Sequence, residues 1–173
     1  MRDGEGLSFV LGEETEKSGP EAFVQSELFA RTFREGMQLV EETANYLDGP
    51  GRDAAEDLSR DNALAYAGAS MRLTTQLMQI ASWLLVLRAV REGEMNLVEA
   101  SDAKYRIEDG GSDNADHLED ELPPELGMLI RDARQLYDRI RRLDIDLFTS
   151  DIESGRDSDA IGQQRALLKA FGG

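Results

Sequence analysis

The sequence contains no cysteine and a single histidine, His117, in 173 residues. Disulfides, thiol catalysis and thiolate metal sites are therefore excluded, and a zinc site or an iron carboxylate site would lack the two or more histidines it normally uses. Basic residues are also few, since 19 Lys and Arg stand against 35 Asp and Glu and give a net charge of −16. Duplex nucleic acid and anionic membrane surfaces repel such a polyanion. The composition favours a soluble protein that works through contacts rather than through chemistry.

Long hydrophobic runs are absent as well. The longest unbroken apolar run is Trp83–Leu87, whereas a membrane span needs about 20 residues. The N-terminal region has only the short apolar stretch Leu7–Leu11, flanked by acids, which is too short for a secretory signal. We therefore expect a cytoplasmic protein with no membrane association.

Helical periodicity dominates the rest of the chain. Apolar residues recur at steps of three and four over 21–47, from Asp53 or Ser59 to Glu92, and from Pro123 to an end within Ser150–Gly155. No segment alternates as a strand would. The expected fold is all-α, a three-helix bundle with long helices over 18–149. A flexible N-terminal segment 1–17, a flexible C-terminal tail 150–173 and an acidic loop 108–121 before the third long helix complete the expected organisation.

Local signals mark where these helices begin and end. Ser18 with Glu21 and Asn96 with Glu99 have the three-residue spacing of a capping box, and the second pair predicts a short helix after the second long one. The sequence Asp48-Gly49-Pro50-Gly51 predicts the end of the first helix, because glycine accepts the left-handed closing conformation and proline cannot continue a helix.

The second long helix carries two apolar stripes. One stripe comprises Leu64, Ala67, Met71, Thr75, Met78, Ala81 and Leu85, and the other comprises Tyr66, Leu73, Leu77, Ile80, Leu84 and Leu87. An outer helix of a three-helix bundle needs one stripe, so two stripes indicate cover on two sides. Either both other helices cover the second long helix, or its second stripe packs against a second copy of the chain. The two interpretations are compatible. We assign Leu73, Leu77, Ile80, Leu84 and Leu87 to a homodimer interface.

Two further surfaces are candidates for partner binding. Trp83, with Val86 and Val90, lies on a third side of the second helix, where either the short helix covers it or a partner does. The third helix carries four arginines on the side opposite its apolar stripe: Arg131, Arg134, Arg141 and Arg142. They form either a solvated face with helix salt bridges or a dock for an acidic segment of this chain or of a partner.

Catalytic and cofactor chemistry finds little support in the residues. Glu35, Glu41 and Glu42 raise the possibility of an all-α magnesium-dependent nucleotide hydrolase, which needs carboxylates from two facing helices. The second helix offers no acid between Asp61 and Glu92. His117 has no Glu-x-x-His partner. We predict no catalytic, cofactor-binding or metal-binding residues.

Two segments carry a family resemblance: FREGMQLVEETANYLDGPGR at 33–52 and MRLTTQLMQIASWLLVLRAVREGEM at 71–95. In this order and at this separation they resemble the alphaproteobacterial regulator of CtrA degradation (RcdA) family, and weaker similarity extends over roughly 20–150. The resemblance implies a cytoplasmic, dimeric three-helix bundle without catalytic activity.

The role that the resemblance implies is that of an adaptor in regulated proteolysis. Such an adaptor binds the ClpXP protease, primed by a response-regulator-like adaptor, and brings cargo that includes cell-cycle transcription regulators. The alternative is a helical dimeric regulator that binds a transcription or localisation factor without any protease.

Overall fold

The computed structural model describes residues 19–108 and 122–171, with side chains described as far as residue 149. Within these residues the chain is helical and has no strand. The elements are α1 (Pro20–Gln25), α2 (Glu27–Asp48), α3 (Pro50–Glu56), α4 (Arg60–Arg91), α5 (Leu97–Ala100), the 3₁₀ helix η1 (Ala103–Tyr105) and α6 (Pro124–Phe171). The expected segment 1–17, most of the acidic loop 108–121 and His117 lie outside the described residues.

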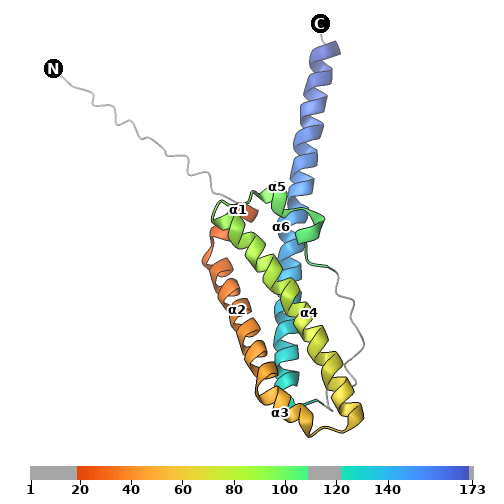
Figure 1. Ribbon diagram of the computed structural model, residues 1–173. Coiled ribbons are helices and arrows are strands. Elements are labelled where there is room, and N and C mark those ends of the chain that lie inside the picture. Colours follow the sequence, from red (N-terminus) through yellow and green to blue (C-terminus); the bar gives the residue numbers. More distant parts are fainter. Residues whose placement is uncertain (1–18, 109–121, 172–173) are drawn as a thin grey trace, which may run out of the picture.

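Helices α2, α4 and α6 run side by side as a three-helix bundle (Figure 1). Each of the three packs against the other two, so the predicted all-α bundle is confirmed. Their apolar faces meet in one core, whose largest fully buried side chains are Phe29, Ile80, Leu84, Leu87, Leu126, Leu136, Ile140 and Val24. Burial of these faces, rather than helix propensity, supplies most of the stability of such helices.

The first predicted helix is divided in two at Ser26. This residue leaves the helix at φ −77° and ψ 156°, and its hydroxyl accepts a hydrogen bond from the Phe29 backbone N–H at 3.1 Å. The same hydroxyl donates to the Phe23 carbonyl at 2.6 Å. A serine N-cap inside the periodic segment therefore ends α1 and begins α2. The predicted stop is confirmed, since α2 ends at Asp48, but Gly49 closes the helix at φ −126° and not in the predicted left-handed conformation.

Of the two predicted starts of the second long helix, Asp53 and Ser59, the structure has Ser59. Ser59 is the N-cap of α4, and its hydroxyl accepts a hydrogen bond from the Asn62 backbone N–H at 3.3 Å. The residues from Pro50 form the separate helix α3. At the other end, α4 stops at Arg91, and Gly93 follows with φ +76°, a conformation that favours glycine.

Residues 93–108, here called the strap, leave α4 and cross toward α6 (Figure 1). The predicted capping box at the start of α5 is confirmed. The Asn96 side chain accepts from the Glu99 backbone N–H at 2.8 Å, and the Glu99 carboxylate accepts from the Asn96 backbone N–H at 2.9 Å.

Helix α6 is longer than predicted. It continues to Phe171 instead of ending within Ser150–Gly155, and its C-terminal part extends past α1 and α5 (Figure 1). No proline interrupts the sequence after residue 149. A glycine within a helix is unfavourable by only about 1 kcal/mol relative to alanine, and extending an existing helix avoids the cost of nucleation. The expected end within Ser150–Gly155 is therefore corrected.

Candidate functional site

The five residues assigned to a homodimer interface lie in the core of a single chain. Leu73, Leu77 and Leu87 are 2%, 4% and 1% exposed. Ile80 and Leu84 are both 0% exposed. A second copy cannot reach these side chains while the bundle is folded, so this residue assignment is corrected. Of the two stripes on α4, the more strongly apolar one faces α2 and α6, because that packing removes the most apolar surface from water.

The other stripe faces outward and is the largest exposed apolar feature of α4. Leu64 is 75% exposed, Met71 72%, Met78 68% and Leu85 52%. Between them lie small or weakly polar exposed residues. We call this surface the outer face of α4. Its residues, all of which are exposed, are Leu64, Ala67, Met71, Thr74, Thr75, Met78, Ser82 and Leu85. A row of large exposed apolar side chains of this kind is typical of an interaction surface.

The apolar character of α4 is strong enough that it meets the length and composition of a membrane span. Its most apolar window of 18 residues has a mean hydropathy of 1.3, and only 33% of that window is buried in the structure. However, α4 packs against both α2 and α6, and Arg72 stands in its middle. The low burial of the window reflects the outer face of α4.

Trp83, a predicted partner-binding residue, is also buried, at 2% exposure. Its indole N–H donates to the Asp144 carboxylate at 2.9 Å, and its ring lies 6.5 Å from that of Phe23. Of the two alternatives for this side of α4, the structure supports cover by the strap, because Val86 and Val90 are partly buried against the core and α5 packs on α4. Trp83 cannot contact a partner in this conformation.

The four predicted arginines share one side of α6. Arg131 and Arg142 are exposed, whereas Arg134 and Arg141 are half-buried. Asp138 lies among them and is exposed. Residues 109–121, which include most of the acidic loop considered as an internal partner for this face, lie outside the described residues. The role of the arginine face in partner binding stays a prediction.

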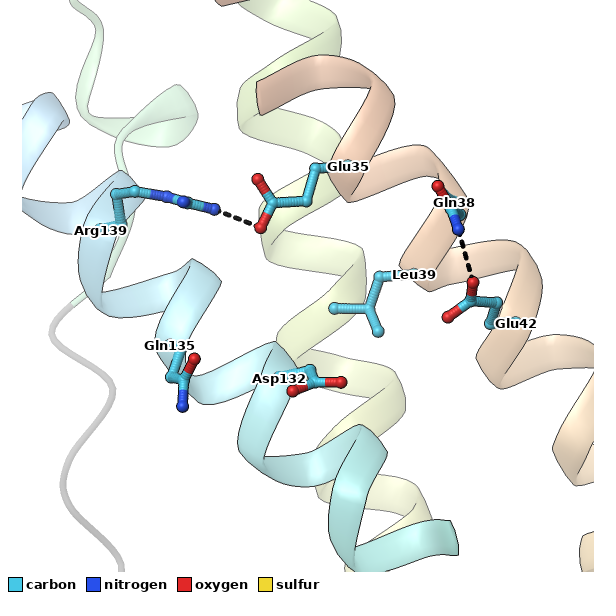
Figure 2. A pocket seen from close by; sticks show the side chains of 7 residues that line it. All are labelled: Glu35, Gln38, Leu39, Glu42, Asp132, Gln135 and Arg139. Atoms are coloured by element: carbon cyan, nitrogen blue, oxygen red, sulfur yellow. Dashed lines mark hydrogen bonds and ion pairs between the residues drawn. The ribbon is translucent and has the colours of Figure 1, made fainter. Parts of the chain in front are cut away.

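A polar groove between α2 and α6, with a volume of about 240 Å³, was not predicted (Figure 2). It is lined by Glu35, Gln38, Leu39, Glu42, Asp132, Gln135 and Arg139. Arg139 reaches across it to form an ion pair with Glu35, and its Nε is buried with no hydrogen-bond partner among the described residues. On the α2 side, Gln38 donates to Glu42 at 2.7 Å. Three carboxylates outweigh one guanidinium here, so the groove is acidic.

Of the carboxylates considered for magnesium, Glu35 and Glu42 line this groove, whereas Glu41 does not. Glu35 is paired with Arg139, Glu42 accepts from Gln38, and Glu41 is exposed. Within residues 19–108 and 122–149, no three His, Asp or Glu side chains come together in an arrangement that could hold a metal ion. A hard divalent cation that binds phosphates needs several converging oxygens.

Comparison with known proteins identifies a matching family and a similar solved structure. The family described as "Protein of unknown function (DUF1465)" matches residues 20–171. The crystal structure of RcdA from Caulobacter crescentus CB15 is 52% identical in sequence, with a TM-score of 0.63, and the match covers 75% of this chain and 98% of that one. The chain belongs to the RcdA family. The search of curated proteins finds no match.

Membership in the RcdA family confirms the resemblance carried by 33–52 and 71–95. This family is that of the regulators of CtrA degradation. Membership therefore places the chain in the context of proteolysis and cell-cycle regulation. The two quoted segments lie on α2, α3 and α4, where the bundle is closely packed.

Proposed function

We propose that this chain is a non-enzymatic, cytoplasmic adaptor in regulated proteolysis. In this proposal it tethers cargo, such as cell-cycle transcription regulators, to ClpXP primed by a response-regulator-like adaptor. The observation that carries the proposal is the 52% identity to RcdA over 98% of that chain. Tethering needs no catalytic group, because holding two proteins on one scaffold raises their effective concentration.

The proposal is tested by reconstituting degradation with purified ClpXP, the priming adaptor and CtrA from the same bacterium. Adding this chain should shorten the lifetime of CtrA, and omitting the priming adaptor should remove the effect. If the chain binds CtrA and leaves its lifetime unchanged, the adaptor proposal fails and a regulator without a protease is the better description.

The arginine face of α6 is the proposed docking site for an acidic segment of a partner. Arginines recognise carboxylates through paired hydrogen bonds, and these four form a local reversal of sign on a chain with net charge −16. Reversing the charge of the exposed pair, Arg131→Glu with Arg142→Glu, should weaken binding of the partner and leave helicity unchanged. The same change at the exposed Arg31 and Arg34 of α2 is the control. Equal binding by both variants would remove this face from the proposal.

Self-association, which the family resemblance implies, is proposed to use the outer face of α4. The order of this face, Leu-Ala-Met-Thr-Thr-Met-Ser-Leu, reads nearly the same in both directions from the Thr74–Thr75 bond. A two-fold axis through that point would place α4 antiparallel to its copy, with Leu64 opposite the partner copy's Leu85 and Met71 opposite its Met78. A two-fold interface requires such self-complementarity, and the small residues allow close approach of the helices.

The dimer is tested by placing a charge at the centre of this face. Met78→Glu should shift the chain to a monomer in light scattering while helicity is retained, because Met78 is 68% exposed. Met128→Glu is the matched control, since Met128 is 55% exposed on α6. A wild-type chain that is monomeric, or a Met78→Glu variant that stays dimeric, would reject this interface.

A further inference from the structure

The strap covers an apolar part of α4 and is itself only lightly structured. Its regular elements are one four-residue helix and one three-residue 3₁₀ helix. Such short helices are unstable in isolation, so their order depends on contacts with the bundle. Those contacts come from a few side chains: Ala100, which is 1% exposed, and the partly buried Met95, Leu97 and Ile107.

The far end of the strap is held by one buried carboxylate. Arg106 Nε lies 2.9 Å from both carboxylate oxygens of Asp144, and its Nη2 donates to the Asp144 backbone carbonyl at 3.1 Å. The Arg106 guanidinium also lies 4.6 Å from the centre of the Phe148 ring. Beside it, the Tyr137 hydroxyl donates to the Glu108 carbonyl. Polar contacts thus fix the strap to α6 at its last residues.

Asp144 on α6 connects the strap to Trp83 on α4, whose ring also lies near Phe23 of α1. The Asp144 side chain is 3% exposed, compared with 24% for Arg106. Its carboxylate accepts from Trp83 on α4 and from Arg106 on the strap. A buried carboxylate that loses its cation is strongly unfavourable. If Arg106 were removed, the indole N–H would be the remaining donor described for this carboxylate, and water could reach it once the strap moved away.

We propose that the strap opens and closes as a unit, with the Arg106–Asp144 ion pair as its latch, and that opening exposes the apolar surface of Trp83, Val86 and Val90. In the closed state the occupant of that surface is the strap itself. Local opening of this kind occurs where regular structure is short and few apolar side chains are anchored. The proposal goes beyond the adaptor function and does not depend on it.

The test uses hydrogen exchange and the fluorescence of Trp83, which is the single tryptophan of the chain. In Arg106→Met, amides of 96–108 should exchange roughly ten- to a hundredfold faster, as expected for loss of a charge-assisted hydrogen bond. Collisional quenching of Trp83 by acrylamide should increase, while exchange in the buried parts of α2 and α6 stays unchanged. Arg34→Met is the control, because it breaks the exposed ion pair of Arg34 with Glu27.

A second variant, Asp144→Asn, separates the latch from the penalty of an unpaired charge. Asparagine keeps an oxygen for the Trp83 N–H but removes the charge that holds Arg106. It should therefore also speed exchange in the strap. Unchanged exchange and quenching in both variants would show that the apolar anchors alone hold the strap and would overturn the latch. Faster exchange spread equally over the whole bundle would show that the strap does not open separately, and would overturn the proposal as well.

Discussion

Substituting Gly36 by alanine tests how closely α2 packs against α4 at this position. A Cβ at this position would lie 2.4 Å from the Leu84 Cδ1 atom, 3.6 Å from the Ile80 Cγ2 atom and 3.7 Å from the Leu136 Cδ2 atom. Carbon atoms pack favourably at about 3.5–4.0 Å, so Leu84 would have to withdraw by about 1 Å. Leu84 is 0% exposed, and a closely packed core leaves little space for that movement.

Two opposing effects set the magnitude. Overpacking a core destabilises by about 1–3 kcal/mol, whereas replacing glycine by alanine inside a helix stabilises by about 1 kcal/mol. Gly127 provides a matched control, since a Cβ there would meet only the Arg131 Nη1 atom, at 3.6 Å. We expect Gly127→Ala to raise the free energy of unfolding and Gly36→Ala to fall below it by about 1–3 kcal/mol.

Urea unfolding followed by helical ellipticity, at equal protein concentrations, measures this difference. A double-mutant cycle adds a check on the cause. In a Leu84→Ala background the crowding is relieved, so Gly36→Ala should then behave like Gly127→Ala. If Gly36→Ala stabilises the wild-type chain as much as Gly127→Ala does, the argument from close packing is refuted.

Three further predictions concern the local chemistry of the bundle. Burial, reinforced by Tyr66 and Glu125, raises the pKa of Tyr46 above 10.0. As the pH rises, Tyr46 therefore ionises in the unfolded chain before it ionises in the folded one. The free energy of unfolding then falls as the pH rises from 10.0 toward the folded pKa. Tyr46→Phe should reduce this loss, as measured by urea unfolding at a series of pH values. At neutral pH, Tyr46→Phe should leave stability equal or slightly higher, because the hydroxyl is buried without a partner among the described residues. Ser26→Ala should lower stability by about 0.5–2 kcal/mol by removing the N-cap of α2, measured by thermal unfolding against the exposed Ser101→Ala.

Periodicity and capping chemistry predicted the helices whose signals are local. Asn96 and Glu99 have a spacing that specifies a capping box, and the structure contains it. Ser26 was missed because no Glu or Gln stands three residues after it, and a serine inside a periodic segment is compatible with a continuous helix. The continuation of α6 was missed because Gly155 resembles a helix end when its neighbours are considered alone.

The candidate surfaces depended on information that is not local. Two apolar stripes on α4 could be recognised from residue spacing, but which of them faces inward depends on where α2 and α6 lie. The seven-residue spacing of Leu64, Met71, Met78 and Leu85, with smaller residues between them, was the available signal for a helix-pairing face. The Asp144 network joins side chains 38 and 61 positions apart, a separation that a single sequence does not reveal.

The continuation of α6 has a consequence for how the molecule could present its C-terminal region. A flexible chain fixes only a range of distances between its ends, whereas a helix fixes both a distance and a direction. From residue 150 to Phe171 the helix spans about 33 Å beyond the last described side chain. Anything attached near Phe171 would turn with α6, so a small rotation of α6 within the bundle would move the far end of the helix through a wide arc.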